Sequence, residues 1–265
     1  MGMNKIPTLK KKILFAGCSF TANCGFTESN RLAYHWTNLL ANHYDCQIKN
    51  IAKGGMINEE IFLRTSEEIL NHKYDLVVVM WSTLSRKWVY CSDRNIDDFT
   101  ILNKGLVSGF NNDDQNIKLY AKIHYSLLNN TYVDLKNWLV YANVLERILT
   151  SNNQPFMFIK GSNNLLEDFK QINWNTETQV FDAVTPLLDT VLDLSNRPDD
   201  YILEKLKRIK NLIDLADNDY WLNFSTASFN ESAIDVADDN SHPGIVSNKN
   251  LFEELVSYID KRSLI

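Results

Sequence analysis

Residues 12–21, KILFAGCSFT, set the fold that this sequence predicts. The apolar run at 13–16 is too short for an independent helix, and Gly17 allows an abrupt change of direction. We therefore predict a buried strand followed by a tight turn. Ser19 would then lie at the carboxyl end of the strand, the edge where open α/β sheets form their ligand-binding crevice. This makes Ser19 a candidate nucleophile, although Gly-X-Ser after a strand is also ordinary turn chemistry.

Strands and helices alternate outward from this first strand. A Leu-Val-Val-Val run at 76–79 has no polar alternation, which is typical of a parallel strand buried on both faces. We predict further strands and helices, with the strands at 47–51, 75–80, 155–160 and 220–224, and the helices at 32–43, 57–70, 117–128, 133–149, 202–216 and 248–259. This alternation implies a parallel sheet with right-handed crossovers.

The composition is that of a soluble globular protein. The 265 residues are 45% hydrophobic and 23% charged, which allows a sizeable core. A net charge of −6 argues against a protein that grips nucleic acid. No stretch approaches the ~20 apolar residues of a membrane span, and residues 1–12 hold no apolar run of signal-peptide length. The four cysteines lack metal-ligand spacing, so we expect a cytoplasmic chain without a metal or other cofactor.

A second chemical motif lies near the C-terminus, where Asp239 precedes His242 by three residues. This spacing can place both on one short turn, so that the carboxylate accepts a hydrogen bond from one imidazole nitrogen and leaves the other free as a base. A lone Asp-x-x-His is more often a solvated loop, but triads are recognised by role rather than by order in the chain. Ser19, His242 and Asp239 are therefore candidate catalytic residues.

Together these segments resemble the SGNH, or GDSL-like, hydrolase superfamily of esterases and lipases. Residues 17–21, GCSFT, are similar to the family's first block with Cys18 in place of the aspartate, and Asp239 with His242 matches the last block. The resemblance implies a flavodoxin-like three-layer α/β/α sandwich with a parallel sheet of about five strands. We expect one such domain over residues 1–265, with helical insertions at about 85–153 and 162–219.

The same resemblance implies an oxyanion hole formed by the backbone amides of Ser19 and Gly55. Residues 50–55, NIAKGG, fit the family's second block and point to that glycine. The third block departs from the pattern, because residues 80–83 read MWST where the family has Gly-x-Asn. Ser82 falls at the asparagine position. The third oxyanion donor is then the Ser82 hydroxyl, is recruited from Asn58, or is missing.

Substrate contacts are expected from the chain around the third block. Residues 85–116 have no clear period, and a loop of this length after the third strand would lie over the catalytic edge. Arg86 and Trp88, together with Asn58 and Trp81, are possible substrate-binding residues. Equally, Trp88 could simply pack on the core.

The resemblance implies a serine esterase or O-deacetylase that cleaves a small-molecule ester or an acylated carbohydrate by a Ser-His-Asp triad. The altered third block favours an alternative, a binding or structural module that kept the fold but lost useful turnover. A third reading is a thiol enzyme that uses Cys18. None of these readings involves nucleic acid or a membrane.

Overall fold

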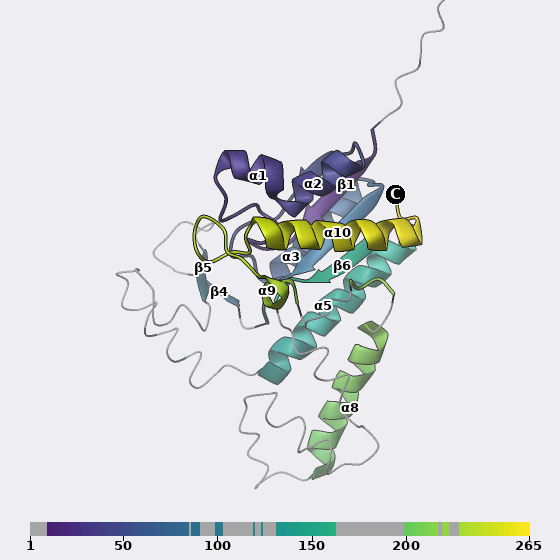
Figure 1. Ribbon diagram of the computed structural model, residues 1–265. Helices are drawn as coiled ribbons and strands as arrows, with labels where there is room; N and C mark the ends of the chain where they lie inside the picture. Colours follow the sequence, from purple (N-terminus) through teal and green to yellow (C-terminus); the bar gives the residue numbers. More distant parts are fainter. Residues whose placement is uncertain are drawn as a thin grey trace, which may run out of the picture.

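The computed structural model describes residues 10–84, 86–90, 99–102, 119, 123, 131–162, 199–216, 219–222 and 228–265. Within them, a parallel sheet of four strands lies at the centre of the molecule (Figure 1). Its spatial order is β2-β1-β3-β6, formed by β1 (Lys12–Ala16), β2 (Gln47–Asn50), β3 (Leu76–Trp81) and β6 (Phe156–Lys160). This order, with the first strand inside the sheet, is that of flavodoxin-like folds.

The strand register brings the carboxyl ends of the strands to one edge. Ala16 of β1 pairs with Val79 of β3, and Trp81 of β3 pairs with Lys160 of β6. Beyond β6, the predicted fifth strand is present as a single parallel bridge between Trp221 and Phe158. Because the strands all run the same way, the loops that follow them meet at this edge.

Helices cover both faces of the sheet and complete three layers. The described helices are α1 (Glu28–Tyr34), α2 (Trp36–His43), α3 (Asn58–Asn71), α5 (Thr131–Ser151), α8 (Asp199–Ala216), α9 (Phe229–Ser232) and α10 (Ile245–Arg262). Helices α3 and α5 pack on one face, with α8 against α5. Helices α2 and α10 pack on the other face, where α10 (yellow) crosses in front of the sheet in Figure 1. The predicted α/β sandwich with a parallel sheet is confirmed.

The core follows from side-chain alternation along two strands that are buried on both faces. Leu14 and Val77 point to the layer of α3 and α5, whereas Ile13 and Val78 point to the layer of α2 and α10. Every residue of β3 is fully buried. Each large apolar side chain removed from water in this way contributes about 1.5–3 kcal/mol, which explains why an uninterrupted apolar run forms this strand.

Two predicted elements need correction. The helix predicted at 32–43 is interrupted at His35, which ends α1 and caps α2 by accepting a hydrogen bond from the Thr37 N–H. The loop predicted at 85–116 contains an antiparallel hairpin of β4 (Lys87–Tyr90) and β5 (Phe99–Leu102). Strands of four residues are too short to give a clear period in the sequence.

The predicted insertions are only partly described. Helix α5, which falls within the insertion expected at 85–153, packs its buried side on the sheet and belongs to a main layer. The helix predicted at 117–128 lies outside the described residues except for Leu119 and Ile123, which are helical. Most of the insertion expected at 162–219 lies outside them too. No helix in the described ranges is both long and apolar enough to cross a membrane.

A close backbone approach at the end of β6 gives a test of the fold. A Cβ on Gly161 would lie 2.6 Å from the Trp81 carbonyl oxygen, so Gly161→Ala should lower the free energy of unfolding by about 1–3 kcal/mol. Gly54→Ala is the matched control, because its nearest neighbour is the Cys24 Sγ at 3.3 Å. Urea unfolding of both variants measures the difference, and equal costs would contradict the close packing of β6 on β3.

Candidate active site

Ser19 lies on a tight turn directly after β1. The backbone N–H of Thr21 donates to the Cys18 carbonyl at 3.0 Å, which closes the turn around the serine. The turn passes so close to β3 that a Cβ on Gly17 would lie 2.9 Å from the Met80 carbonyl oxygen. Glycine is therefore needed where the chain leaves the strand, and its position decides where Ser19 is presented.

A buried polar cluster formed by His35, Trp36 and Thr37, here called the Phe20 clamp, holds the backbone carbonyl of Phe20, the residue after Ser19. The Phe20 carbonyl accepts hydrogen bonds from His35 Nε2 at 3.1 Å and from Trp36 Nε1 at 2.9 Å. His35 Nδ1 lies 2.9 Å from Thr37 Oγ1. Burial lowers the pKa of His35 to about 3, although the hydrogen bond to Phe20 opposes the shift. The His35 imidazole is therefore neutral near pH 7, with its proton on Nε2.

The predicted pairing of Asp239 with His242 is present on one turn. Asp239 Oδ2 lies 2.5 Å from His242 Nδ1, while Asp239 Oδ1 accepts the backbone N–H groups of Ser241 and His242, both at 3.0 Å. Partial burial raises the pKa of Asp239, but the hydrogen bonds from these two residues outweigh it and hold the pKa well below its usual range. An ionised carboxylate thus fixes the imidazole through Nδ1 and leaves Nε2 free of it.

The Asp239–His242 turn packs directly against the loop that carries Ser19. A Cβ on Gly25 would lie 2.9 Å from His242 Cβ and 3.1 Å from Asp239 Oδ1, and the Phe20 ring lies edge-on to the His242 ring at 5.6 Å. Gly25 also has φ +88, so glycine is required there for its backbone as well as for its size. Within the described ranges, no hydrogen bond joins Ser19 Oγ to His242.

Two side chains secure this contact between distant parts of the chain. Asp238 Oδ2 accepts the Thr27 N–H at 3.0 Å and lies 3.2 Å from the donor Asn30 Nδ2. Asn248, buried in α10, accepts the Trp36 N–H at 3.2 Å and donates to the Pro243 carbonyl at 2.9 Å. Asn248 thereby links Pro243, the residue after His242, to Trp36 of the Phe20 clamp.

Two backbone amides predicted for the oxyanion hole are available. In the part of the chain that the structure describes, the N–H groups of Ser19 and Gly55 donate to no acceptor. Gly55 has φ +76 in the loop after β2, and that loop is joined to the Ser19 turn by the Lys53 N–H, which donates to the Gly17 carbonyl at 3.3 Å. Both amides therefore belong to connected loops at the carboxyl edge.

The third block is organised by Asn58 and Arg86. Asn58 Oδ1 accepts the Ser82 N–H at 2.7 Å, and Asn58 Nδ2 donates to the carbonyls of Ser82 and Thr83 at 3.1 and 3.3 Å. Arg86 Nη1 donates to Ser82 Oγ at 3.0 Å. Asn58 Nδ2 thus already donates to two carbonyls of the protein, whereas the Ser82 hydroxyl hydrogen has no acceptor among the described residues.

One predicted site residue, Trp81, lies elsewhere than expected. Trp81 is fully buried in the core against Trp138 and Phe158, which corrects its assignment as a substrate contact. The Cys18 thiol is also buried in the core, which argues against a thiol nucleophile. Trp88 lies on β4, and its side chain is outside the described part of the chain.

Sequence reasoning missed the residues that hold the site together. Among them are the loop glycine Gly25 and three side chains, Asp238, Asn248 and His35. No local spacing singles out His35, because its partner Phe20 lies fifteen positions away along the chain. In the described ranges, no group of three or more His, Cys, Asp or Glu side chains could hold a metal ion.

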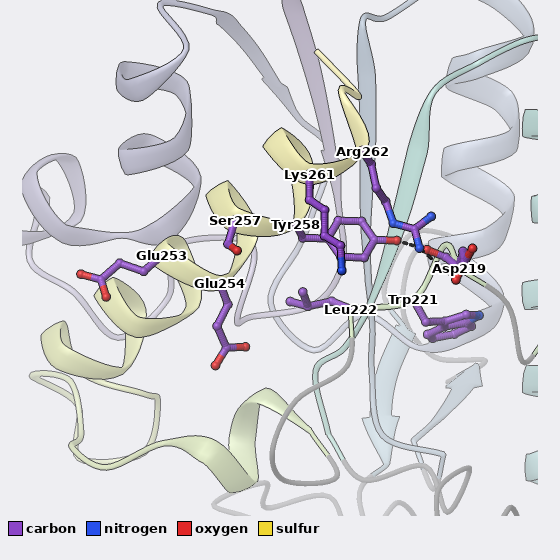
Figure 2. A pocket seen from close by; sticks show the side chains of 9 residues that line it. All are labelled: Asp219, Trp221, Leu222, Glu253, Glu254, Ser257, Tyr258, Lys261 and Arg262. Carbon is purple, nitrogen blue, oxygen red and sulfur yellow. Dashed lines mark hydrogen bonds and ion pairs between the residues drawn. The ribbon is translucent and has the colours of Figure 1, made fainter.

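A separate hollow of about 600 Å³ lies along the second half of α10 (Figure 2). Arg262 pairs there with Asp219 at 3.0 Å, and Tyr258 donates its hydroxyl hydrogen to the Asp219 carbonyl. The helical residues that line it begin at Glu253, roughly 12 Å along the axis from the start of α10. Because His242 precedes that start, the hollow is not part of the candidate active site.

No family model and no curated protein matches this sequence. The fold is similar to that of solved structures at low identity. A protein described as lipolytic and of the G-D-S-L family from Desulfitobacterium hafniense DCB-2 is 10% identical, with 94% of this chain and 99% of that chain covered and a TM-score of 0.43.

Two esterase structures are similar to the same extent. The psychrotrophic esterase EstA from Pseudoalteromonas sp. is 12% identical, with coverage of 95% and 97% and a TM-score of 0.44. The acetylxylan esterase Axe2 from Geobacillus stearothermophilus is 14% identical, with coverage of 94% for both chains and a TM-score of 0.43.

The neutral, buried state of His35 predicts a pH dependence of stability. The unfolded chain takes up a proton near the ordinary histidine pKa of 6.5, whereas the folded chain does so only near 3, so stability is lost as the pH falls between these values. The unfolding free energy should fall by up to about 1.4 kcal/mol per pH unit from this group. The unfolding free energy of the His35→Gln variant should fall less steeply as the pH is lowered.

The measurement is urea unfolding at several pH values between 6.5 and 4. His43→Gln, at an exposed position of α2, controls for the loss of a histidine. A His35→Gln slope equal to that of the natural chain would mean that His35 is not held neutral by burial.

Proposed function

We propose that this chain is a serine ester hydrolase of the esterase or O-deacetylase type, with Ser19 as nucleophile, His242 as base and Asp239 as the orienting acid. The observation that carries the proposal is the Asp239–His242 pair at 2.5 Å, packed through Gly25 and Phe20 against the loop of Ser19. A charged carboxylate behind an imidazole, on a turn that packs against the loop of a serine at the carboxyl edge of a parallel sheet, suits acyl transfer.

The chemistry follows from the engaged and free nitrogens of His242. Nδ1 is engaged by Asp239, so Nε2 takes the Ser19 proton as Ser19 Oγ attacks the ester carbonyl. His242 then returns this proton to the leaving alcohol, and water cleaves the acyl-enzyme by the same steps. The hydrogen bond from Ser19 to His242 forms when substrate binds. Catalytic hydrogen bonds are often long or poorly aligned in unliganded sites and tighten in the substrate complex.

Negative charge on the carbonyl oxygen requires donors that are already in place. Among the described residues, the Ser19 and Gly55 amides and the Ser82 hydroxyl hydrogen have no acceptor, whereas Asn58 Nδ2 already donates to two carbonyls. We therefore assign the third donor to Ser82 rather than Asn58. Each such donor is typically worth about 10²–10³ in rate.

The substrate class that we propose is a small-molecule or carbohydrate ester, on the sequence resemblance to SGNH hydrolases. The net charge of −6 fits a neutral ester better than a nucleic acid. The alternative, a module of this fold without turnover, is favoured by the replaced third block and is an outcome of the experiment below.

Fluorophosphonate labelling and aryl acetate hydrolysis test the proposal together. The natural chain should hydrolyse the ester and label at Ser19, and Ser19→Ala should abolish both. Asp239→Asn should lower kcat by roughly 10³–10⁴, because the imidazole loses the acceptor that fixes its tautomer.

Asp238→Asn is the matched control for the orienting acid. Its carboxylate anchors the loop through Thr27 and Asn30 and makes no hydrogen bond to His242, so the loss should stay below about tenfold. Equal losses for both aspartate variants would contradict the assignment of Asp239. A folded chain that neither hydrolyses nor labels would favour the binding module, and activity blocked by thiol alkylation alone would favour Cys18.

A further inference from the structure

The Ser82 side chain has a partner that the sequence pattern did not anticipate. Arg86 Nη1 donates to Ser82 Oγ at 3.0 Å, and no carboxylate pairs with Arg86 within the described residues. Arginine keeps its charge at any working pH, so this is a charge-assisted hydrogen bond. Its positive charge is directed at one hydroxyl oxygen that is itself almost fully buried.

The backbone and the side chain of Ser82 are therefore both fixed before any ligand binds. The Asn58 amide holds the backbone on either side of the residue, through the Ser82 N–H and the Ser82 carbonyl. With a lone pair of Oγ occupied by Arg86, the hydroxyl hydrogen must point elsewhere. A hydroxyl that accepts from a cation is polarised and becomes a stronger donor.

Arg86 approaches Ser82 from the side of α3 and α5. Arg86 lines a cavity of about 70 Å³ together with Asn58 and Glu59 of α3 and Asp134 and Trp138 of α5, and neither of these carboxylates forms an ion pair with it within the described residues. It thus reaches Ser82 from the layer of these two helices. A residue placed there supports Ser82 from behind instead of forming an outer wall for the substrate.

Ser82 follows β3 at the same edge of the sheet at which Ser19 follows the neighbouring strand β1. Ala16 pairs with Val79 in parallel, so Ser19 and Ser82 each lie three residues beyond a paired position on neighbouring strands. The two chains are still close one residue past this pair, where a Cβ on Gly17 would lie 2.9 Å from the Met80 carbonyl oxygen.

We infer that Arg86 is a positioning residue that acts through Ser82, and that the Ser82–Arg86 pair takes the place of the third-block asparagine as oxyanion donor. The inference rests on the proposed ester hydrolysis. Asparagine offers an amide N–H that is already partly positive, whereas a serine hydroxyl is free to rotate. Arg86 removes that freedom and adds charge, which supplies a preorganised donor.

A double-mutant cycle with an aryl acetate tests this inference. Ser82→Ala should lower kcat by about 10²-fold, and Arg86→Met by about tenfold, with KM little changed in either variant. In the Ser82→Ala background, Arg86→Met should cause no further loss in kcat, because the group through which it acts is gone. Arg86→Lys should recover part of the activity, since an ammonium group can also donate to Ser82 Oγ.

The controls separate this role from folding and from substrate binding. Arg64→Met removes an arginine that pairs with Glu60 on α3 and should leave kcat unchanged. Arg86→Gln is made beside Arg86→Met, so that one unfolded variant does not remove the test. Equal losses from Arg86→Met in both backgrounds, no loss at all, or a rise in KM at constant kcat would each overturn the inference.

The outcome also distinguishes the inference from the function on which it rests. If the natural chain hydrolyses ester and labels at Ser19 while the cycle is additive, the positioning role fails and the hydrolase stands. A natural chain without hydrolysis or labelling would overturn both.

Discussion

Burial of β1 and β3 on both faces is the constraint on which the candidate site depends. Helices cover the apolar side chains of these strands from two sides, so polar residues are accommodated best where the strands end. Parallel pairing aligns those ends, which is why Ser19 and Ser82 follow neighbouring strands at one edge. The sheet that stabilises the fold therefore also brings together segments that are far apart in the chain.

Elements whose pattern comes from burial could be predicted from the sequence. The apolar run of β3, the apolar spacing of α3 and α5, and the amphipathic α10 each reflect contact with a continuous core. The break at His35 could not be predicted, because its cause is tertiary. The imidazole donates to the Phe20 carbonyl, fifteen positions away along the chain.

The same distinction applies within the site. Asp239 and His242 are three residues apart, so their hydrogen bond is local and the spacing predicts it. The positions of Gly25 and Arg86 depend on how loops from different strands pack, and no spacing encodes that. The resemblance in sequence shows that the third block is altered, whereas the hydrogen bond from Arg86 to Ser82 is visible only in the structure.

Asp239 performs two tasks that usually compete for one carboxylate. Oδ1 closes the turn on two backbone N–H groups, and Oδ2 binds the imidazole, so ionisation is favoured by the fold itself before His242 gains a proton. In the proposed mechanism, protonation of His242 then creates an ion pair at a geometry that already exists, with little reorganisation. The buried amide of Asn248 ties Pro243 to Trp36, and Trp36 in turn holds Phe20. Movement of the His242 turn away from the Ser19 turn would therefore have to break buried hydrogen bonds, which keeps these two turns in adjoining positions.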